Sequence, residues 1–362
     1  MSYRNTYRTK YNFRIMTSLK KAVQSALRSP SVTHALEGSP GVGKTLGTKA
    51  ILEHAGYNVT VVSCQNIPIE DTAQLPKVGS EDYTFIPNRL WKPLGGKQAI
   101  ILDELFKAPE DVCNAFIPLL HGKPRKFMSY EYPDDTIVIA TGNSAVFKAG
   151  DRFRPHHVNR MALLTIDDPS PAEAMEVFLT IECDARILNW VEKVPYALTS
   201  YDSKIQSQPT SELTNYFGYL EREPRKPFCS MRSIELASTI LKDSSPGDDT
   251  EDTLKGILGK QATASLYMSM QDSIEFINYR DMISDPLSCK VPKNLFDQRM
   301  AAMSAASALN KETWKPLVSY VSRLNVNLIR LFWHSVSLKT IPLSLMADSA
   351  FNKAFSAGLI VK

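Results

Sequence analysis

Apolar and polar positions in the first half of the chain form two alternating patterns. Short apolar runs of strand length occur five times, at 32–36, 58–64, 98–103, 136–141 and 162–166. Segments with apolar residues three or four positions apart lie at 13–28 and about 44–56, 110–120 and 171–182. Strands that alternate with helices predict an α/β fold, a five-stranded parallel sheet with helices on both faces.

The strand pattern stops after Asp167, and the remaining sequence is helical in pattern. Residues 168–271 indicate helices joined by loops, and 272–362 are helical again. In the last segment one helix face carries Trp314, Leu317, Val318, Val321 and Leu324. We therefore expect four segments, namely a basic segment 1–28, an α/β domain 29–167, an all-α segment 168–271 and a helical C-terminal extension 272–362.

Composition narrows the class of protein. Hydrophobic residues make up 43% of the 362 residues and charged residues 22%, which excludes a disordered or fibrous chain. No stretch approaches the roughly 18 apolar residues of a membrane helix, so we expect no membrane contact. Five cysteines without a C-x-x-C pair favour reduced thiols in a cytoplasmic protein. The six histidines lack zinc-binding spacing.

Basic residues gather at both ends of the chain. Residues 1–36 contain seven Lys and Arg and no acidic residue, and 290–362 contain ten against three acidic residues. Such ends are typical of a solvated face, or of pairing with the acidic middle of a neighbouring subunit. They are also compatible with contact to nucleic acid or an acidic partner. A solvated face, or pairing with a neighbouring subunit, is favoured because the basic residues form no dense run.

A glycine-rich segment carries the strongest chemical signal. Gly38-Ser-Pro-Gly-Val-Gly43-Lys44-Thr45 fits G-x-x-x-x-G-K-[ST], directly after a predicted strand and at the start of a predicted helix. Such a loop surrounds phosphate oxygens with backbone N–H groups. We expect Lys44 to reach the β/γ-phosphates of ATP and Thr45 to ligate Mg²⁺. The expected nucleotide-binding residues are Gly38, Ser39, Pro40, Gly41, Val42, Gly43, Lys44, Thr45 and Leu46. The sequence therefore predicts a P-loop NTPase.

Two further strands end in polar side chains. Asp103 and Glu104 follow the apolar run 98–103, and Asn143 follows the run 136–141. Ligands of open α/β sheets bind at the carboxyl ends of strands. We expect Asp103 to hold Mg²⁺ through water and Glu104 to act as the base toward an attacking water. Asn143 is expected to orient the same water beside the γ-phosphate.

The order of these motifs resembles an AAA+ ATPase, and the closest resemblance is to the MoxR-like branch. Asp103-Glu-Leu-Phe-Lys-Ala-Pro109 is similar to that branch's D-E-I-N-R-A-P. The stretch Tyr83-Thr-Phe-Ile-Pro-Asn-Arg-Leu90 resembles its insert hairpin, F-E-F-R-P-G-P-L. The resemblance covers about residues 15–355 and implies an AAA+ core, a helical lid over 168–271 and an extended C-terminal region of bacterial or phage type.

The resemblance also implies arginines at the site. Val158-Asn-Arg160-Met161 is similar to L-D-R-F, which implies that Arg160 is an arginine finger, with Arg152 as runner-up and Arg154 nearby. Cys229-Ser-Met-Arg232-Ser-Ile-Glu resembles the lid motif S-P-R-S-W-E, which implies that Arg232 is sensor 2. Met231 stands where the family has Pro. A strand-end salt bridge for Arg160 and a solvated helix position for Arg232 are the alternatives.

Two surface elements are candidates for substrate contact. One is the insert hairpin with Tyr83 and Phe85, whose alternative is ordinary strand packing. The other is the basic turn 122–127 with Lys123, Arg125 and Lys126, whose alternative is a solvated turn. In AAA+ hexamers similar to this protein, both positions face the central channel.

The function expected from these observations is Mg²⁺-dependent ATP hydrolysis by a ring, which the resemblance makes a hexamer. Remodelling or maturation of a protein client is implied by the resemblance, with a von Willebrand factor A-type protein as one such partner. A nucleic-acid motor or loader is the first alternative, although the chain has no helix-turn-helix or RNA-binding signature. The second is a nucleotide-switched assembly protein with little turnover, which the complete set of site residues disfavours.

Overall fold

The computed structural model describes residues 16–73, 75–76, 85–86, 88–147, 155–244, 249–270, 277–338, 341 and 343–360. The chain divides into two compact units at Asp168, one over Ile15–Asp168 and one that contains Pro169–Lys362. The first is an α/β unit and the second a helical unit. No described helix has the length and apolar character needed to cross a bilayer.

A five-stranded parallel sheet forms the centre of the α/β unit. Its strands, in spatial order, are β2 (Asn58–Ser63), β5 (Gln98–Asp103), β8 (Ile137–Asn143), β1 (Thr33–Gly38) and β9 (Met161–Ile166). In the register of the central strands, Gly38 pairs with both Asn143 and Ile166. The predicted strands and their parallel arrangement are confirmed. The carboxyl ends of all five strands consequently meet at one edge.

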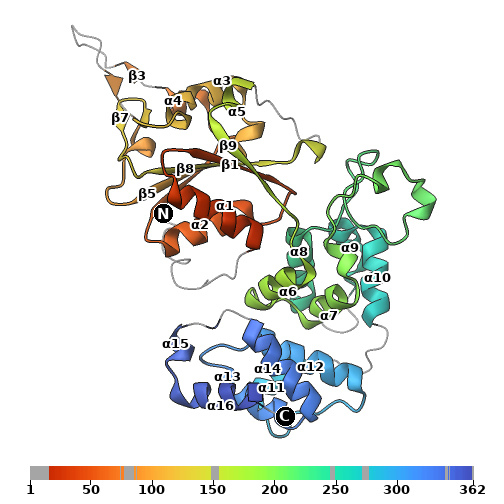
Figure 1. The fold of residues 1–362 in the computed structure, drawn as a ribbon. Coiled ribbons are helices and arrows are strands. Elements are labelled where there is room, and N and C mark those ends of the chain that lie inside the picture. The colour runs from red at the N-terminus through yellow and green to blue at the C-terminus, as the bar shows by residue number, and fades with distance from the viewer. Residues whose placement is uncertain are drawn as a thin grey trace. The chain divides into compact units, whose positions relative to one another are not determined.

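Helices cover both faces of this sheet (Figure 1). One face carries α1 (Thr17–Arg28) and α2 (Lys44–His54), and the other carries α3 (Glu110–Ala115), α4 (Ile117–Leu120) and α5 (Pro155–Val158). The helix expected over 110–120 is broken at Phe116, because Pro118 has no N–H to donate within a continuous helix. Helix α1 buries Leu19, Ala22, Val23 and Ala26, which are spaced for one face.

Two short antiparallel pairs extend from the α/β unit. One joins β3 (Leu75–Pro76) to β4 (Phe85–Ile86), and the other joins β6 (Lys126–Phe127) to β7 (Tyr130–Glu131). Strand β4 lies within the stretch 83–90 that resembles the insert hairpin, whereas β3 precedes it; Tyr83 and the side chain of Phe85 fall outside the described residues. The 3-10 helices of the chain are η1 (Ile69–Thr72), η2 (Arg89–Trp91), η3 (Leu105–Lys107), η4 (Ala145–Phe147), η5 (Pro195–Leu198), η6 (Ile205–Ser207) and η7 (Thr210–Glu212).

The described part of the helical unit contains two large apolar cores. The first gathers α6 (Pro171–Thr180), α7 (Ala185–Lys193), α8 (Met231–Asp243), α9 (Glu251–Leu258) and α10 (Lys260–Met270). The second gathers α11 (Tyr279–Ser284), α12 (Leu295–Ser307), α13 (Trp314–Val321), α14 (Val326–Leu338), α15 (Leu343–Met346) and α16 (Ser349–Ile360). Helix α12 contacts both α7 and α14. On α13, Trp314, Leu317 and Val321 are buried as expected, and Leu324 is buried beyond the end of the helix.

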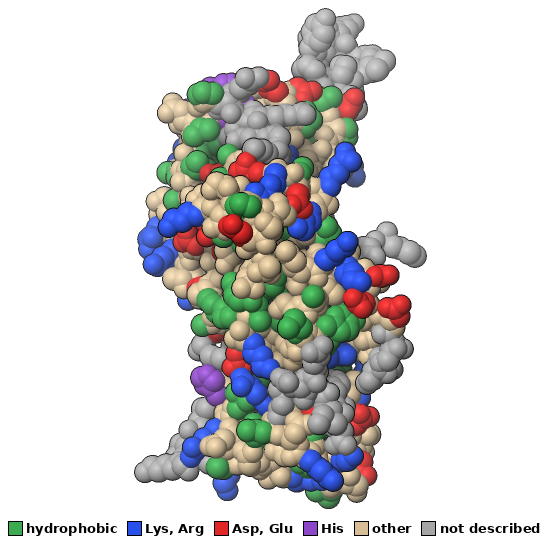
Figure 2. Space-filling model, turned by 90° about the vertical axis from the view of Figure 1, so that its right-hand side faces the viewer, with side chains coloured by type: hydrophobic (Ala, Val, Ile, Leu, Met, Phe, Trp, Pro, Cys, Tyr) green, Lys and Arg blue, Asp and Glu red, His purple; other side chains and the backbone are tan. Residues whose placement is uncertain are grey.

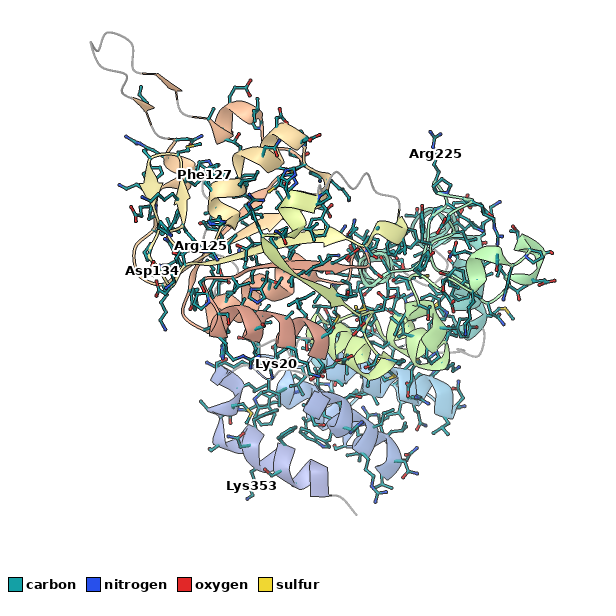
Figure 3. All side chains as sticks on the ribbon, turned by 45° about the horizontal axis from the view of Figure 1, so that its top comes forward. Lys20, Arg125, Phe127, Asp134, Arg225 and Lys353 are labelled. Atoms are coloured by element: carbon teal, nitrogen blue, oxygen red, sulfur yellow. The ribbon has the colours of Figure 1, made fainter. Side chains whose placement is uncertain are left out.

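The expectation that Arg125 contacts a substrate or solvent from a basic turn is wrong, because its side chain is buried, with 1% of its surface exposed. The guanidinium donates to Pro30 O at 2.7 Å, Leu119 O at 2.7 Å, Thr33 Oγ1 at 2.8 Å and Thr136 O at 3.2 Å. Burial lowers the pKa of Arg125 to about 10, so the side chain remains charged at neutral pH. Figure 3 shows Arg125 and Phe127 at the base of the β6–β7 pair, with Asp134 at the outer surface. Arg125 therefore links the loops at the amino ends of β1 and β8.

Replacement of Arg125 tests this structural role. Arg125→Met should lower the free energy of unfolding by about 3 kcal/mol, since it leaves buried carbonyl groups without their donor. Lys123→Met is the matched control, because Lys123 pairs with Asp134 at 3.3 Å on the surface and should contribute less than about 1 kcal/mol. Urea unfolding measures both. Equal stability of the two variants would contradict the structural role given to Arg125.

His34 predicts a pH-dependent stability. Its Nδ1 lies 3.0 Å from Val32 O and its Nε2 3.1 Å from Ser25 Oγ. Burial, with a smaller contribution from Arg125, lowers the pKa of His34 below its ordinary value of 6.5. Below pH 6.5 the unfolded chain then binds more protons than the folded one, so stability falls as the pH falls. Denaturation at pH 7.5 and 5.5 should show a smaller decline in the free energy of unfolding for His34→Gln than for wild type. Identical declines would show that His34 does not cause the pH dependence.

Candidate nucleotide-binding site

The segment between β1 and α2 has the backbone of a phosphate-binding loop. Gly41 and Gly43 have φ angles of 76° and 90°, which side chains other than glycine rarely adopt. Gly43 immediately precedes α2, whose first residue is Lys44. Nothing lies within 4 Å of the Cβ that a larger residue would place at Gly43. The loop therefore has open space at a helix N-terminus, where backbone N–H groups favour an anion.

Lys44 lies at the centre of the loop with only 7% of its surface exposed. Its Nζ donates to Gly38 O at 3.0 Å, to Ser39 O at 2.8 Å and to Asn143 Oδ1 at 3.2 Å. These contacts bring Lys44 and Asn143 together, 99 residues apart in sequence. Within the nine-residue segment, Val42 is buried and Leu46 is exposed on α2. An ammonium group held by weak carbonyl acceptors is suited to exchange them for phosphate oxygens.

Asp103 joins the loop to the sheet. Its Oδ1 accepts hydrogen bonds from Thr45 Oγ1 and, at 2.7 Å, from Thr141 Oγ1. A hydroxyl and a carboxylate are the oxygen ligands that Mg²⁺ accepts in phosphate sites. The described residues contain no group of three His, Cys, Asp or Glu able to hold a metal, so a Mg²⁺ here would need phosphate oxygens or waters. Thr45 and Asp103 fit that requirement.

Glu104 has an unusual backbone. Its φ angle is 55°, the left-handed region that residues other than glycine rarely occupy. The Glu104 N–H donates to Thr141 Oγ1 at 3.2 Å. Its carboxylate Oε2 lies 2.6 Å from Lys107 Nζ. Strained backbone of this kind is concentrated at functional sites.

Arg160 lies far from the phosphate-binding loop of the same chain. It precedes β9, whose first residue Met161 pairs with Thr33, whereas Gly38 pairs with Ile166 at the other end. Five residues of parallel strand span about 16 Å, which exceeds the reach of an arginine side chain. The guanidinium donates to His156 O. Arg160 therefore lies at the amino edge of the sheet and cannot reach the phosphate-binding loop of the same chain.

The remaining arginines are placed as follows. Arg232 is exposed in the first turn of α8, in the helical unit. Arg152 and Arg154 lie outside the described residues.

Thr141 contacts the Asp103 carboxylate and Lys107 contacts the Glu104 carboxylate, and neither residue was predicted from the sequence to belong to the site. A signal for Thr141 was present, since it stands two positions before Asn143 and so shares its face of β8. Lys107 gave no such signal. Its contact depends on the 3-10 helix η3, which turns the chain back toward Glu104.

Comparison with known proteins identifies the domain type. Residues 34–161 match the family model described as AAA domain (dynein-related subfamily). This match includes the loop, Asp103 and Asn143. The α/β unit is therefore a P-loop AAA domain with a five-stranded parallel sheet, followed by a mostly helical part, as the sequence predicted. No curated protein matches the chain.

Solved structures share general similarity with the chain. A candidate ATPase from Cytophaga hutchinsonii is 17% identical with a TM-score of 0.35, over 45% of this chain and 50% of that chain. NtrX from Brucella abortus is 15% identical with a TM-score of 0.35, over 67% and 54%. NtrX in complex with ADP is 12% identical with a TM-score of 0.35, over 94% and 67%. The chain thus spans about half the length of the first two proteins.

The close approach at Gly38 generates a prediction. A Cβ at Gly38 would lie 2.5 Å from the backbone oxygen of Ile166, so Gly38→Ala should force β1 and β9 apart and lower stability by about 2 kcal/mol or more. Gly256→Ala adds the same methyl group on α9, where nothing lies within 4 Å, and should stabilise by up to about 1 kcal/mol. Thermal unfolding measures both. A neutral Gly38→Ala would show that the two strands can move apart freely.

Proposed function

We propose that this protein is a Mg²⁺-dependent ATPase of the AAA+ type, which acts as a ring and remodels a protein partner in the cytoplasm. The observation that carries the ATPase proposal is the Lys44–Asn143 contact beside the Thr45–Asp103 contact at one sheet edge. Lys44 would bind the transferred phosphate, Thr45 and Asp103 would hold Mg²⁺, the latter through water, and Glu104 would take a proton from the attacking water. A bound Mg²⁺ would supply positive charge beside the phosphate oxygens.

The position of Arg160 supports action between subunits. Because Arg160 lies at the edge opposite its own loop, it can complete only a neighbour's site. Charge develops on the phosphoryl oxygens during transfer, and an arginine supplied in trans stabilises it. The proposal therefore requires a ring, for which we favour a hexamer. Arg232, exposed at the start of α8, is proposed to approach the γ-phosphate from the subunit's own lid.

A protein client is favoured over nucleic acid by the charges of the basic turn. Lys123 pairs with Asp134 and Lys126 with Glu131, each at 3.3 Å, and Arg125 is buried. The face in Figure 2 carries basic and acidic side chains side by side among its described residues. The β3–β4 and β6–β7 pairs are the proposed client contacts, consistent with a MoxR-like protein and a von Willebrand factor A-type partner.

Salt-dependent assays separate the protein-remodelling proposal from its alternatives. If the client is a protein, adding DNA should leave the ATPase activity unchanged at each of two salt concentrations. Stimulation by DNA that falls steeply with salt would instead favour a nucleic-acid motor. Nucleotide binding without turnover would favour a nucleotide-switched assembly protein.

The chemical roles predict distinct phenotypes. Glu104→Gln should bind ATP with near wild-type affinity and lower kcat by about 100-fold or more, because an amide cannot accept the proton. Lys44→Ala should weaken nucleotide binding itself. Glu53→Gln is a matched control, since Glu53 pairs with Lys49 on the surface of α2. Fluorescent-nucleotide titration and phosphate release measure both properties. Near wild-type turnover by Glu104→Gln would show that Glu104 is not the general base.

Assembly predicts complementation. Arg160→Ala should lower turnover by about 10³-fold, the typical effect of losing an arginine finger. A mixture of Arg160→Ala and Lys44→Ala subunits should regain activity, because some interfaces then pair an intact loop with an intact arginine. Specific activity of wild type should rise with protein concentration. Co-assembled mixtures that stay inactive would exclude Arg160 as the finger, and Arg152 would be tested next.

A further inference from the structure

One buried hydroxyl group connects the two acidic residues of the site. Thr141 is 1% exposed and lies on β8, next to the strand that ends in Asp103. The register that pairs Leu102 with Ala140 brings Asp103 and Thr141 side by side. Thr141 Oγ1 donates to Asp103 Oδ1 at 2.7 Å and accepts from the Glu104 N–H at 3.2 Å.

The two hydrogen bonds of Thr141 have different consequences. A hydroxyl has a single proton to donate, and here that proton is committed to Asp103. Thr45 Oγ1 donates to the same carboxylate oxygen, so two hydroxyls fix the orientation of the Asp103 carboxylate. The bond from Glu104 N–H acts on the backbone and holds Glu104 at a φ of 55°, a conformation that a glutamate would otherwise leave.

We propose that Thr141 is a positioning residue that holds both Asp103 and Glu104 in their working orientations. This inference rests on the proposed ATPase function and deepens it. Through Asp103, Thr141 sets the geometry of the metal ligand. Through the Glu104 backbone, it sets the direction from which the base approaches water. Loss of the hydroxyl should therefore impair metal-dependent binding and turnover together.

The same two strands offer a comparison for a purely structural hydrogen bond. Gln98 Nε2 donates to Thr136 Oγ1 at 3.2 Å, and both residues are buried. This bond also joins the β5 side of the sheet to the β8 side, but at the amino edge. Thr136→Val therefore removes a buried hydroxyl between the same strands, at a distance of several residues from the site.

The experiment compares Thr141→Val, Thr141→Ser and Thr136→Val in the full chain. Thr141→Val should lower kcat about 10- to 100-fold and raise the KM for Mg²⁺–ATP. It should also raise the Mg²⁺ concentration that gives half-maximal activity. Thr141→Ser keeps the hydroxyl and should stay within about threefold of wild-type kcat. Thr136→Val should lose thermal stability but keep its kcat.

A binding measurement makes the result independent of turnover. Fluorescent ATP is titrated with Mg²⁺ and with EDTA. Thr141→Val should match wild type in EDTA and lose most of the gain in affinity that Mg²⁺ provides. Wild-type kcat in Thr141→Val, an impaired Thr141→Ser, or an equal loss of kcat in Thr136→Val would each overturn the proposal. An unchanged gain from Mg²⁺ in Thr141→Val would overturn the part that concerns Asp103.

Glu104→Gln, measured in parallel, distinguishes a failure of the ATPase proposal from a failure of the proposed role of Thr141. If Glu104→Gln is inactive and Thr141→Val is active, the ATPase proposal stands and the role of Thr141 fails. If wild type binds Mg²⁺–ATP without turnover, the ATPase proposal fails, and the Mg²⁺-dependent binding of Thr141→Val still decides the role of Thr141 toward Asp103.

Discussion

The parallel register of the central strands is the constraint on which the site depends. Because β1 pairs in parallel with β8 and β9, Gly38, Asn143 and Ile166 lie in one row. The same rule brings Asp103 beside Thr141. A shift of one residue in either pair would turn alternate side chains to the opposite face of the sheet. The side chains of the acidic residues and the asparagine would then no longer face one another at this edge.

Buried cations stabilise both edges of this sheet by a common principle. At the carboxyl edge, Lys44 donates to two backbone carbonyls and one amide oxygen. At the amino edge, Arg125 donates to three carbonyls and one hydroxyl. A buried charge is tolerated when hydrogen bonds replace the hydration that it loses. The two differ in consequence, since Lys44 lies within the phosphate-binding loop, whereas the contacts of Arg125 connect loops.

The separation of the two edges also gives the proposed mechanism its dependence on assembly. Arg160 and the phosphate loop are both in the α/β unit, yet the length of β9 keeps them apart. A subunit therefore carries a binding site at one edge and a cation at the other. Two such subunits placed head to tail would combine them, which is the interface type that generates rings.

The sequence by itself determined the α/β class, the five strands and the composition of the phosphate loop. These features are encoded locally, in apolar runs and in glycines at fixed spacing, so no distant contact is needed to recognise them. Its prediction that Lys44, Asp103 and Asn143 share a site followed from the topology of parallel sheets. It misjudged Arg125, because a basic residue between two other basic residues has the same pattern whether it is solvated or buried.

Only the tertiary structure decided which groups touch. Thr141 contacts Asp103 and Glu104 across 38 and 37 residues of sequence, and Arg125 contacts Thr33 across 92. Each contact depends on a strand register and a side-chain direction that no local pattern specifies. The free energy of burying a polar group is settled only when its partners arrive from elsewhere in the chain. For that reason the residue types of the site were readable from the sequence, whereas the hydrogen bonds that orient them were not.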